Sequence, residues 1–330
     1  MNMKIVYLSR SKTAGFSIEK VMRPLIQNTS NSLELELPCA GASPIAIIKN
    51  LIWVWQRRKS DCIYHITGDV HYVSLVLPKN RTITTVHDLV SQSYNRYSRL
   101  KKFLLRLLYV EVLRKNRFII CISEKTKKEV MSFIDFPKDR IFVIPDPISD
   151  DFHYVKQDFH SDCPIILHIG TKSNKNLHKT IEALAGLNVK LRIIGLLDSE
   201  TEIKLKKSRI DYTSVHNLTD EQVRKEYIDC DIVNFPSLYE GFGMPILEAQ
   251  ATGRVCITSD IEPMRSVAGD GALLVNPKDV ESIRAGYEKI LNDSKLRDNL
   301  IEHGLENVNK YREKNVIDAY HCIYEIVGRS

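Results

Sequence analysis

The chain of 330 residues contains no apolar run that approaches the roughly 18 residues needed to span a bilayer. Its N-terminal stretch holds one short apolar run, Ile5–Leu8, and lacks the architecture of a signal peptide. No Gly-x-Gly-x-x-Gly segment is present, which disfavours a dinucleotide cofactor. The seven cysteines are scattered, with no Cys-x-x-Cys pair and no Cys/His cluster, so neither a disulfide framework nor a zinc site is indicated. A reducing, cytoplasmic location fits this cysteine usage best.

What the chain does contain is enough apolar material for full-sized cores, because 43% of its residues are hydrophobic and 27% are charged. The net charge of +6 conceals an asymmetry. Residues 1–150 carry 24 basic and 13 acidic side chains, a balance of +11, whereas residues 151–330 carry 23 and 28, a balance of −5. The front half is therefore the basic one.

The densest basic segment is Arg96–Arg117, with eight basic residues, one acid and apolar residues at helical spacing. Two interpretations stay open. The segment is either a core helix with a solvated basic face, or a surface that touches an anionic acceptor or the inner face of an anionic membrane as a peripheral contact. Nucleic acid is not predicted as a partner, because no aromatic-basic interleaving or known binding motif accompanies the charge.

Short apolar runs alternate with polar, helix-like stretches along the whole chain, which predicts an α/β fold with parallel sheets covered on both faces. About five strands are expected in each half: residues 4–8, 62–66, 82–86, 118–122 and 141–144, then 165–169, 190–194, 232–235, 255–258 and 272–275. The polar, acidic stretch 146–162 marks the boundary. We expect two Rossmann-like domains facing each other across a cleft, an N-terminal domain at 1–157 and a C-terminal domain at 158–307. A C-terminal helix at 308–330 would return to the first domain.

The most informative segment is 236–253, Pro-Ser-Leu-Tyr-Glu-Gly-Phe-Gly-Met-Pro-Ile-Leu-Glu-Ala-Gln-Ala-Thr-Gly. A glycine turn followed by Pro245 predicts a helix start, with Pro245 at the first helical position and Glu248 in the first turn. Glu240 then lies on the preceding loop. Backbone amides at such a start favour phosphates, and carboxylates accept hydrogen bonds from sugar hydroxyls. The segment is thus suited to a sugar nucleotide.

A second segment, Leu167–Leu177, reads as a strand, a glycine turn and a helix start that contains Lys172 and Lys175. A lysine at such a loop can stabilise the negative charge that develops on a departing diphosphate. Two weaker signals lie in the front half. His87 follows a predicted strand, where its side chain would face the cleft. Gly15 follows the first strand, where a glycine lets the backbone approach a ligand closely.

Taken together, these segments resemble retaining glycosyltransferase family 4 (glycosyltransferase group 1), whose two-domain fold is known as GT-B. The resemblance is sharpest from Pro164 to Pro277, and residues 237–248 match the family signature almost letter for letter. It implies that Glu240 binds hydroxyls of the transferred sugar, Glu248 binds the ribose, and Lys175 binds the diphosphate. His87 would lie beside the sugar, and Val215 would border the nucleotide base. Many relatives carry an arginine near the position of Lys172, and a lysine cannot reproduce its bidentate fork.

The sequence therefore predicts a retaining, metal-independent hexosyltransferase of polysaccharide biosynthesis with no cofactor and with a nucleotide-diphosphate sugar as co-substrate. Its catalytic residues would be His87, Lys175 and Glu240. Its donor-binding residues would be Gly15, Lys172, Val215, Gly241, Phe242, Gly243, Met244 and Glu248. The acceptor would be a hydroxyl of a glycan or lipid-linked saccharide. The formal metal-binding pattern Asp229-Cys-Asp231 directly precedes a strand, so we expect Asp231 to be structural. Two alternatives stay open: a sugar-nucleotide epimerase of the same fold, and a non-catalytic nucleotide- or glycan-binding module.

Overall fold

The computed structural model describes residues 3–11, 13, 17–41, 43–89 and 99–329, and every structural statement below concerns these residues. The chain divides into two compact units. Unit 1 comprises Met1–Pro147 together with Glu313–Ser330, and unit 2 comprises Ile148–Arg312. The chain passes from unit 1 into unit 2 after Pro147 and returns to unit 1 after Arg312; the sequence predicts these boundaries at residues 157 and 307. Each unit contains one parallel sheet, and the α/β class predicted from the sequence is confirmed.

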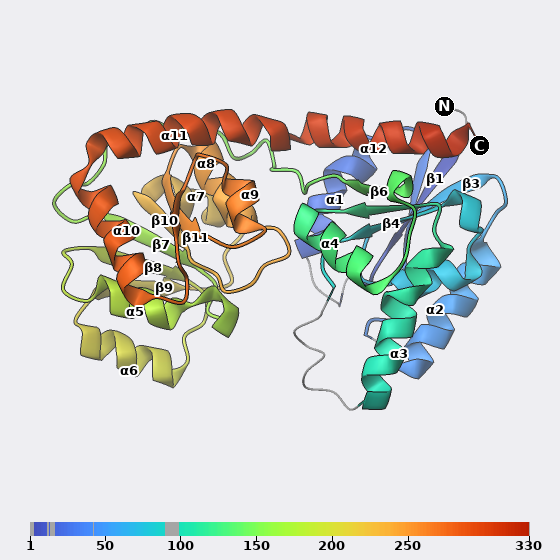
Figure 1. Cartoon of the computed structure of the whole chain (residues 1–330), viewed down its shortest axis with the longest axis horizontal. Helices are drawn as coiled ribbons and strands as arrows, with labels where there is room; N and C mark the ends of the chain where they lie inside the picture. The colour runs from blue at the N-terminus through green and yellow to red at the C-terminus, as the bar shows by residue number, and fades with distance from the viewer. Residues whose placement is uncertain (1–2, 12, 14–16, 42, 90–98, 330) are drawn as a thin grey trace. The chain divides into compact units, whose positions relative to one another are not determined.

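The sheet of unit 1 has the strand order β2-β1-β3-β4-β5-β6, and all of its strands are parallel. Its strands β1, β3, β4 and β6 are labelled in Figure 1. Its strands are β1 Lys4–Ser9, β2 Ser32–Glu36, β3 Cys62–Ile66, β4 Thr82–Val86, β5 Phe118–Cys121 and β6 Ile141–Val143. Its helices are α1 Ser17–Gln27, α2 Pro44–Arg57, η2 His71–Val76, η3 Lys79–Arg81, α3 Arg99–Tyr109, η5 Glu111–Lys115, α4 Glu124–Phe133, η6 Lys138–Arg140 and α12 Glu313–Gly328.

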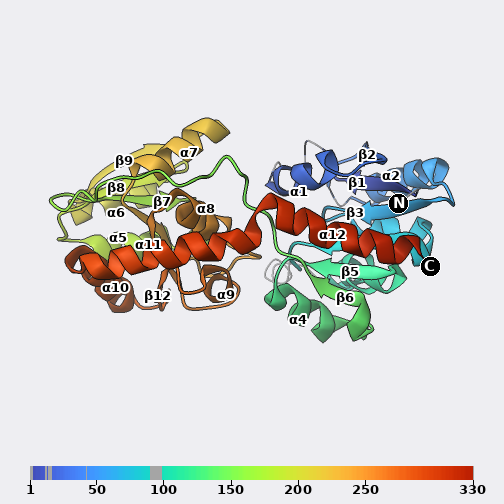
Figure 2. The ribbon, with the colours of Figure 1, turned by 90° about the horizontal axis from the view of Figure 1, so that it is seen from above.

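The two faces of this sheet bury separate cores, because alternate residues of a strand point to opposite sides. On one face, α1 and the C-terminal helix α12 pack against β1 and β3, as seen from above in Figure 2. Tyr320 and Tyr324 of α12 are fully buried there beside His65 of β3. On the other face, α2 and η2 cover the apolar residues of the same strands. The last helix of the chain is therefore part of the core of unit 1.

The sheet of unit 2 has the order β12-β11-β10-β7-β8-β9 and is also parallel throughout. Its strands are β7 Ile165–Ile169, β8 Lys190–Ile194, β9 Asp211–Val215, β10 Ile232–Phe235, β11 Val255–Ser259 and β12 Leu273–Val275. Its helices are η7 Ser173–Lys175, α5 Leu177–Leu184, α6 Ser199–Ser208, α7 Asp220–Asp229, α8 Met244–Thr252, α9 Met264–Ala268, α10 Val280–Asn292, α11 Ser294–Val308 and η8 Asn309–Tyr311.

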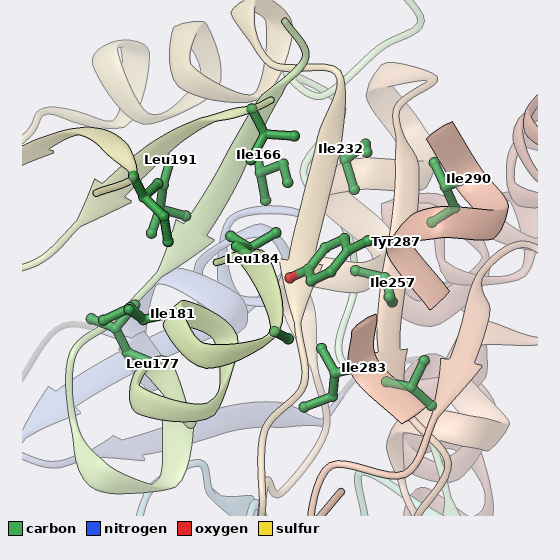
Figure 3. Packing of buried hydrophobic residues seen from close by; sticks show 14 of the residues in the cluster. Ile166, Leu177, Ile181, Leu184, Leu191, Ile232, Ile257, Ile283, Tyr287 and Ile290 are labelled. Atoms are coloured by element: carbon green, nitrogen blue, oxygen red, sulfur yellow. The ribbon is translucent and has the colours of Figure 1, made fainter. Parts of the chain in front are cut away.

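One face of this second sheet is closed by α5 and α10. Figure 3 shows their side chains meeting residues of β7, β8, β10 and β11 in an aliphatic core. The hydroxyl of Tyr287 in this core donates to Asn234 Oδ1 at 2.5 Å, and the Asn234 amide donates to Thr180 Oγ1 at 3.0 Å and contacts the His168 ring. Burial lowers the pKa of His168 to about 3, so this ring is neutral. The core thus encloses a polar network in which Asn234 links Tyr287, Thr180 and His168.

Both sheets have six strands where the sequence predicted about five, and the two strands missed, β2 and β9, each lie at an edge. Their sequences, Ser-Leu-Glu-Leu-Glu and Asp-Tyr-Thr-Ser-Val, are too polar to form a continuous apolar run. An edge strand faces solvent along one side, so it is exempt from the near-continuous hydrophobicity that marks the central strands of a parallel sheet. A search for apolar runs therefore finds the interior strands and the apolar edge strands β6 and β12, but not the polar edge strands β2 and β9.

Candidate functional site

The carboxyl edge of the second sheet holds the candidate site of unit 2. The chain order of the strands reverses between β7 and β10, since β8 and β9 follow on one side and β11 and β12 on the other. In open α/β sheets a ligand binds outside the carboxyl ends of the strands at such a switch point. Lys175 follows β7 and Glu240 follows β10, so both lie on loops at this reversal.

Lys175 and Glu240 form an ion pair, with Lys175 Nζ 2.6 Å from Glu240 Oε1. The ammonium also lies over the ring of Phe235, 4.7 Å from its centroid. Gly170, which ends the turn after β7, has φ +90, and an added Cβ there would meet Lys175 Cγ at 2.9 Å. The glycine therefore leaves room for the lysine stem to reach the glutamate. The structure brings together two residues that are 65 positions apart in the sequence.

Asn174 was not predicted from the sequence, yet it links the same two loops. Its side-chain amide donates to the carbonyl oxygen of Tyr239 at 3.1 Å and to Glu240 Oε1 at 3.3 Å. Its own carbonyl oxygen accepts from the backbone N–H of Leu238 at 2.8 Å. An asparagine in a polar loop carries no sequence signal of such a role. The contacts fix the position of Glu240 relative to the lysine loop.

The helix start predicted in segment 236–253 is α8, although its register differs from the expectation. Gly243 is the N-cap and the helix begins at Met244, so Pro245 is the second helical residue and not the first. Consequently Glu248 lies beyond the first turn, and the prediction that placed it there was wrong. A proline is tolerated at either position, because the first helical N–H groups have no intrahelical partner.

Gly243 requires its glycine, since its φ is +123 and an added Cβ would lie 3.2 Å from Ile246 Cδ1. Phe242 is buried, and its ring packs 5.9 Å from the ring of Tyr311, so its side chain is structural and only its backbone is available to a ligand. Gly241 and Met244 are half-buried on either side of this turn. The turn therefore presents backbone at the start of α8.

Glu248 has a buried partner that the sequence did not reveal. The hydroxyl of Tyr227, on α7, donates a short hydrogen bond to Glu248 Oε2. Burial and the adjacent carboxylate raise the pKa of Tyr227 well above its ordinary value, so the hydroxyl keeps its proton. The ring of Tyr227 in turn packs edge-on against Phe152 at 5.5 Å. Glu248 is thus held by a group that can only donate to it.

The remaining predicted residues of unit 2 lie on neighbouring loops. Lys172 is exposed and forms no ion pair with another described residue. Val215 ends β9, and its carbonyl oxygen accepts from the N–H of Gly195 at 2.7 Å. Asp231 is buried and accepts from the backbone N–H of Ile165 at 2.7 Å. That carboxylate is occupied by the backbone, and among the described residues no group of three or more His, Cys, Asp or Glu side chains could hold a metal ion.

In unit 1, His87 follows β4 and is held on both ring nitrogens. Its Nε2–H donates to the carbonyl oxygen of Thr67 at 3.0 Å, and its Nδ1 lies 3.6 Å from Asp146 Oδ1. Burial disfavours protonation, but the charge of Asp146 and the two acceptors outweigh it, so the pKa of His87 is raised above its ordinary value. Gly15 lies outside the described residues.

The first sheet also has a switch point, between β1 and β3, and a cavity of about 460 Å³ lies at its carboxyl edge. Its lining comes from the loops after β1, β2 and β3 and includes Arg10, Ser11, Thr13, Cys39 and Asp69. Arg10 forms a bidentate pair with Glu19 at 2.6 and 3.0 Å and lies 3.6 Å from Asp69, whose side chain is half exposed. The cavity therefore offers hydroxyls and an accessible carboxylate to a polar ligand.

Comparisons with known proteins find two family models that match this chain. Residues 150–307 match the family model described as glycosyl transferases group 1, and residues 32–152 match the model described as glycosyltransferase family 4. O-antigen chain mannosyltransferase B of Escherichia coli is 26% identical over 296 residues, which cover 80% of this chain and 75% of that protein. The serotype-specific mannosyltransferase WbdA of Escherichia coli is 28% identical over 295 residues, 77% of this chain, but the match spans only 35% of WbdA.

Solved structures share the fold at low sequence identity. HepE of Anabaena in complex with UDP and glucose has a TM-score of 0.80 at 13% identity, covering 98% of this chain and 100% of that one. The sucrose-phosphate synthase of Thermosynechococcus elongatus has a TM-score of 0.78 at 15% identity, with coverages of 98% and 99%. At these identities the likeness establishes the fold.

Proposed function

Because this chain belongs to the group 1, family 4 glycosyltransferases and has their GT-B fold, we propose that it moves a hexose from a nucleoside-diphosphate sugar to a hydroxyl of a glycan or lipid-linked saccharide. The observation that carries the proposal is the Lys175–Glu240 pair at the switch point of the second sheet. A cation and a carboxylate 2.6 Å apart can receive the phosphate and the hydroxyl groups of one sugar phosphate.

In the proposed reaction the bond between the anomeric carbon and the diphosphate oxygen breaks, and its electron pair leaves with the diphosphate. Lys175 and the backbone at the start of α8 stabilise that charge as it develops. The acceptor oxygen forms the new bond to the anomeric carbon, and its proton passes to the departing phosphate. Glu240 binds hydroxyls of the transferred sugar and Glu248 binds the ribose. No protein nucleophile and no metal ion is required by this scheme.

Unit 1 would bind the acceptor saccharide. The cavity beside Arg10 and Asp69 is lined by hydroxyl and carboxylate groups, which suits the hydroxyls of a saccharide. His87 stands on the same carboxyl edge of the first sheet, after β4. With both nitrogens engaged by Thr67 and Asp146, its proposed role is to share an N–H with a sugar hydroxyl, rather than to act as a base.

The biological setting proposed is cell-surface polysaccharide synthesis. It is suggested by the names of two relatives, O-antigen chain mannosyltransferase B of Escherichia coli and the capsular polysaccharide biosynthesis glycosyltransferase CapM of Staphylococcus aureus. A retaining outcome is part of the proposal, and a cytoplasmic location stays a prediction.

The decisive experiment incubates the purified chain with mannose- and glucose-bearing nucleoside-diphosphate sugars and an acceptor extract of lipid-linked saccharide. Release of nucleoside diphosphate that depends on acceptor, together with a new glycosidic linkage of unchanged anomeric configuration by NMR, is the expected result. Inversion at the anomeric carbon would contradict the retaining scheme while leaving the transferase intact. Chelator should leave the rate unchanged.

The two alternatives give different products. An epimerase would convert the sugar nucleotide into its epimer without acceptor, whereas a binding module would release no nucleoside diphosphate at any acceptor concentration. The ion pair of Lys175 with Glu240 suits a transferase and a nucleotide-binding module alike, because both must neutralise an anionic diphosphate, so the acceptor-dependent release of nucleoside diphosphate is the measurement that separates them.

A further inference from the structure

Helix α2 is apolar on two opposite sides. Its buried side, Ala46, Ile47, Asn50 and Val54, packs into the core of unit 1. Its outer side carries a stripe of large apolar residues three or four positions apart, with exposed fractions from 51% to 68%: Ile45, Ile48, Ile52 and Trp55. A surface helix of a globular protein normally turns polar residues outward. The outer stripe of α2 therefore has no partner among the described residues.

The elements packed beside α2 continue this character. Helix α2 packs against η2, and α3 packs against η2 as well. Leu75 of η2 is 49% exposed, and α3 exposes Phe103, Leu104 and Leu107. From the sequence, we interpret the apolar residues of α3 either as the buried side of a core helix or as part of a surface that contacts a membrane. Their exposure contradicts the first interpretation for these three residues, whereas Val110 is buried as a core position would be.

The same three elements contain no acidic residue. Helix α2 contributes Lys49 and Arg57, and Arg58 and Lys59 follow directly after it. Helix α3 reads Arg-Leu-Lys-Lys-Phe-Leu-Leu-Arg-Leu-Leu-Tyr, and its Arg106 pairs with Glu111 of η5. Charge of one sign beside exposed apolar side chains is the composition of a surface that binds an anionic interface.

We propose that the outer faces of α2, η2 and α3 form a docking surface for a bilayer that contains anionic phospholipid. Ile48, Ile52 and Trp55 would enter the boundary between headgroups and acyl chains, with Lys49 and the basic run after α2 at the phosphates. Helix α2 has 14 residues, too few to cross a hydrocarbon core that needs about 20. No helix in the described part of the chain is long and apolar enough to span a membrane. The surface would lie on a bilayer and not enter it further.

The charges favour lipid over a second copy of this chain. A self-complementary interface would bring the basic groups of α2 and α3 against themselves, and like charges placed face to face are destabilising. An anionic bilayer neutralises them. The aromatic ring of Trp55, with the Arg58 guanidinium 5.6 Å from its centroid, has the amphipathic character that places tryptophan at membrane interfaces.

The test measures binding of the full chain to vesicles of phosphatidylcholine alone and of phosphatidylcholine with phosphatidylglycerol, by flotation at several salt concentrations. Binding is expected only to the mixed vesicles, and it should weaken with salt. Ile52→Ser should lower the partition coefficient about tenfold. Its matched control is Ile203→Ser on α6 of unit 2, since Ile203 is 54% exposed and Ile52 is 51% exposed. The control should bind like the unchanged chain.

A charge variant complements the apolar one. Lys49→Gln with Lys59→Gln should weaken binding about fivefold for each charge removed. Lys206→Gln with Lys207→Gln on α6 removes the same charge from unit 2 and should have no effect. Both positions of each pair are exposed, so these variants do not disturb a core.

The chain carries its own reporter, because both of its two tryptophans, Trp53 and Trp55, lie on α2. In the variant Trp53→Phe, emission comes from Trp55 alone. Mixed vesicles should shift that emission to shorter wavelength, and brominated lipid should quench it. The fluorescence measurement needs neither the sugar donor nor the acceptor, so its result does not depend on whether the proposed reaction is correct.

Three outcomes would overturn the proposal: equal binding to neutral vesicles, equal losses in the α2 and α6 variants, or unshifted Trp55 emission in the presence of bound vesicles. A fourth would be a concentration-dependent dimer that Ile52→Ser dissociates, with no vesicle binding at all. That result would assign the surface to a second copy of the chain.

Discussion

The two units have the same six-stranded parallel sheet, yet their surfaces differ in character. In unit 2 the loops after β7 and β10 are joined to each other by Lys175, Asn174 and Glu240. In unit 1, His87 at the carboxyl edge of the sheet contacts the Thr67 carbonyl oxygen and the Asp146 carboxylate. Unit 1 also carries ten of the fourteen exposed large apolar side chains among the described residues. One sheet plan thus supports a small charged site in one unit and a broad apolar-basic surface in the other.

The difference is consistent with the partners proposed for each unit. A diphosphate sugar is small, polar and always the same shape, so a few side chains fixed by hydrogen bonds are enough to bind it. An acceptor attached to a lipid must be met at a surface, where affinity comes from area and charge. The following predictions test whether chemistry is concentrated in unit 2 and association in unit 1.

The largest effect is expected at Lys175. Lys175→Ala should raise the barrier by about 2–4 kcal/mol, because the developing diphosphate charge loses its cation. Turnover should fall by about 30- to 1,000-fold, and donor affinity should change less. Steady-state kinetics with calorimetry of donor binding separate the two quantities.

Lys190→Ala is the control, since Lys190 begins β8 at the opposite edge of the same sheet. Equal turnover in the Lys175 and Lys190 variants would remove Lys175 from the mechanism. Lys172→Ala should lie between them, because Lys172 is exposed in the same loop and holds no fixed partner.

The next effect divides the two glutamates. Glu248→Gln should lower the affinity for bare nucleoside diphosphate about tenfold or more, since a charged acceptor for ribose hydroxyls is lost while the partner of Tyr227 is kept. Glu240→Gln should leave that affinity near its original value and weaken binding only when the sugar is attached. Calorimetry with both ligands decides the matter, and equal losses of bare nucleotide affinity would contradict the assigned roles.

The extent to which sequence predicts this molecule also differs between the units. The candidate segment of unit 2 could be singled out from the sequence because Glu240, the glycine turn and Glu248 lie in one contiguous stretch whose spacing is itself the signal, and their roles stay a prediction. Tyr227 and Asn174 were not, because a tyrosine in an amphipathic helix and an asparagine in a loop have no local pattern that reveals a distant partner. The edge strands β2 and β9 were not predicted, because their sequences contain no continuous apolar run.

In unit 1 the missing information is almost entirely long-range. His87 was recognised at the end of its strand, but its partners Thr67 and Asp146 follow other strands, and only the strand order brings them together. The outer stripe of α2 was overlooked because residues 44–57 are apolar nearly all round, a pattern that predicts a buried helix. Which side is covered depends on packing against η2.

A smaller effect is expected at Tyr227. Tyr227→Phe removes one hydrogen bond from Glu248 and should weaken nucleoside diphosphate binding by about 1 kcal/mol, with turnover at saturating donor little changed. Tyr287→Phe is the matched control, because Tyr287 is equally buried in the same unit and donates to Asn234 instead. Both variants should lower stability, so a loss of affinity in both would show that general loosening, and not the position of Glu248, is responsible.

The smallest effect is electrostatic and belongs to unit 1. The pKa of His87 in the folded chain is raised by Asp146, so an NMR titration of its ring should give a midpoint above the ordinary value of about 6.5. The His65 ring, whose pKa burial lowers to about 3, should not titrate over the same range and serves as an internal control. Asp146→Asn should lower the midpoint of His87, because the charge of Asp146 is lost while the other titratable neighbours, Asp88, His65 and His71, are unchanged.

The same shift predicts how stability depends on pH. Since the protonated His87 ring favours the folded state, its contribution to stability should be full below about pH 6.5 and should vanish as the pH rises through the raised folded-state pKa. His87→Gln should therefore cost more stability at pH 6 than at pH 9, and a cost independent of pH would show that the ring is held by its hydrogen bond to Thr67 alone.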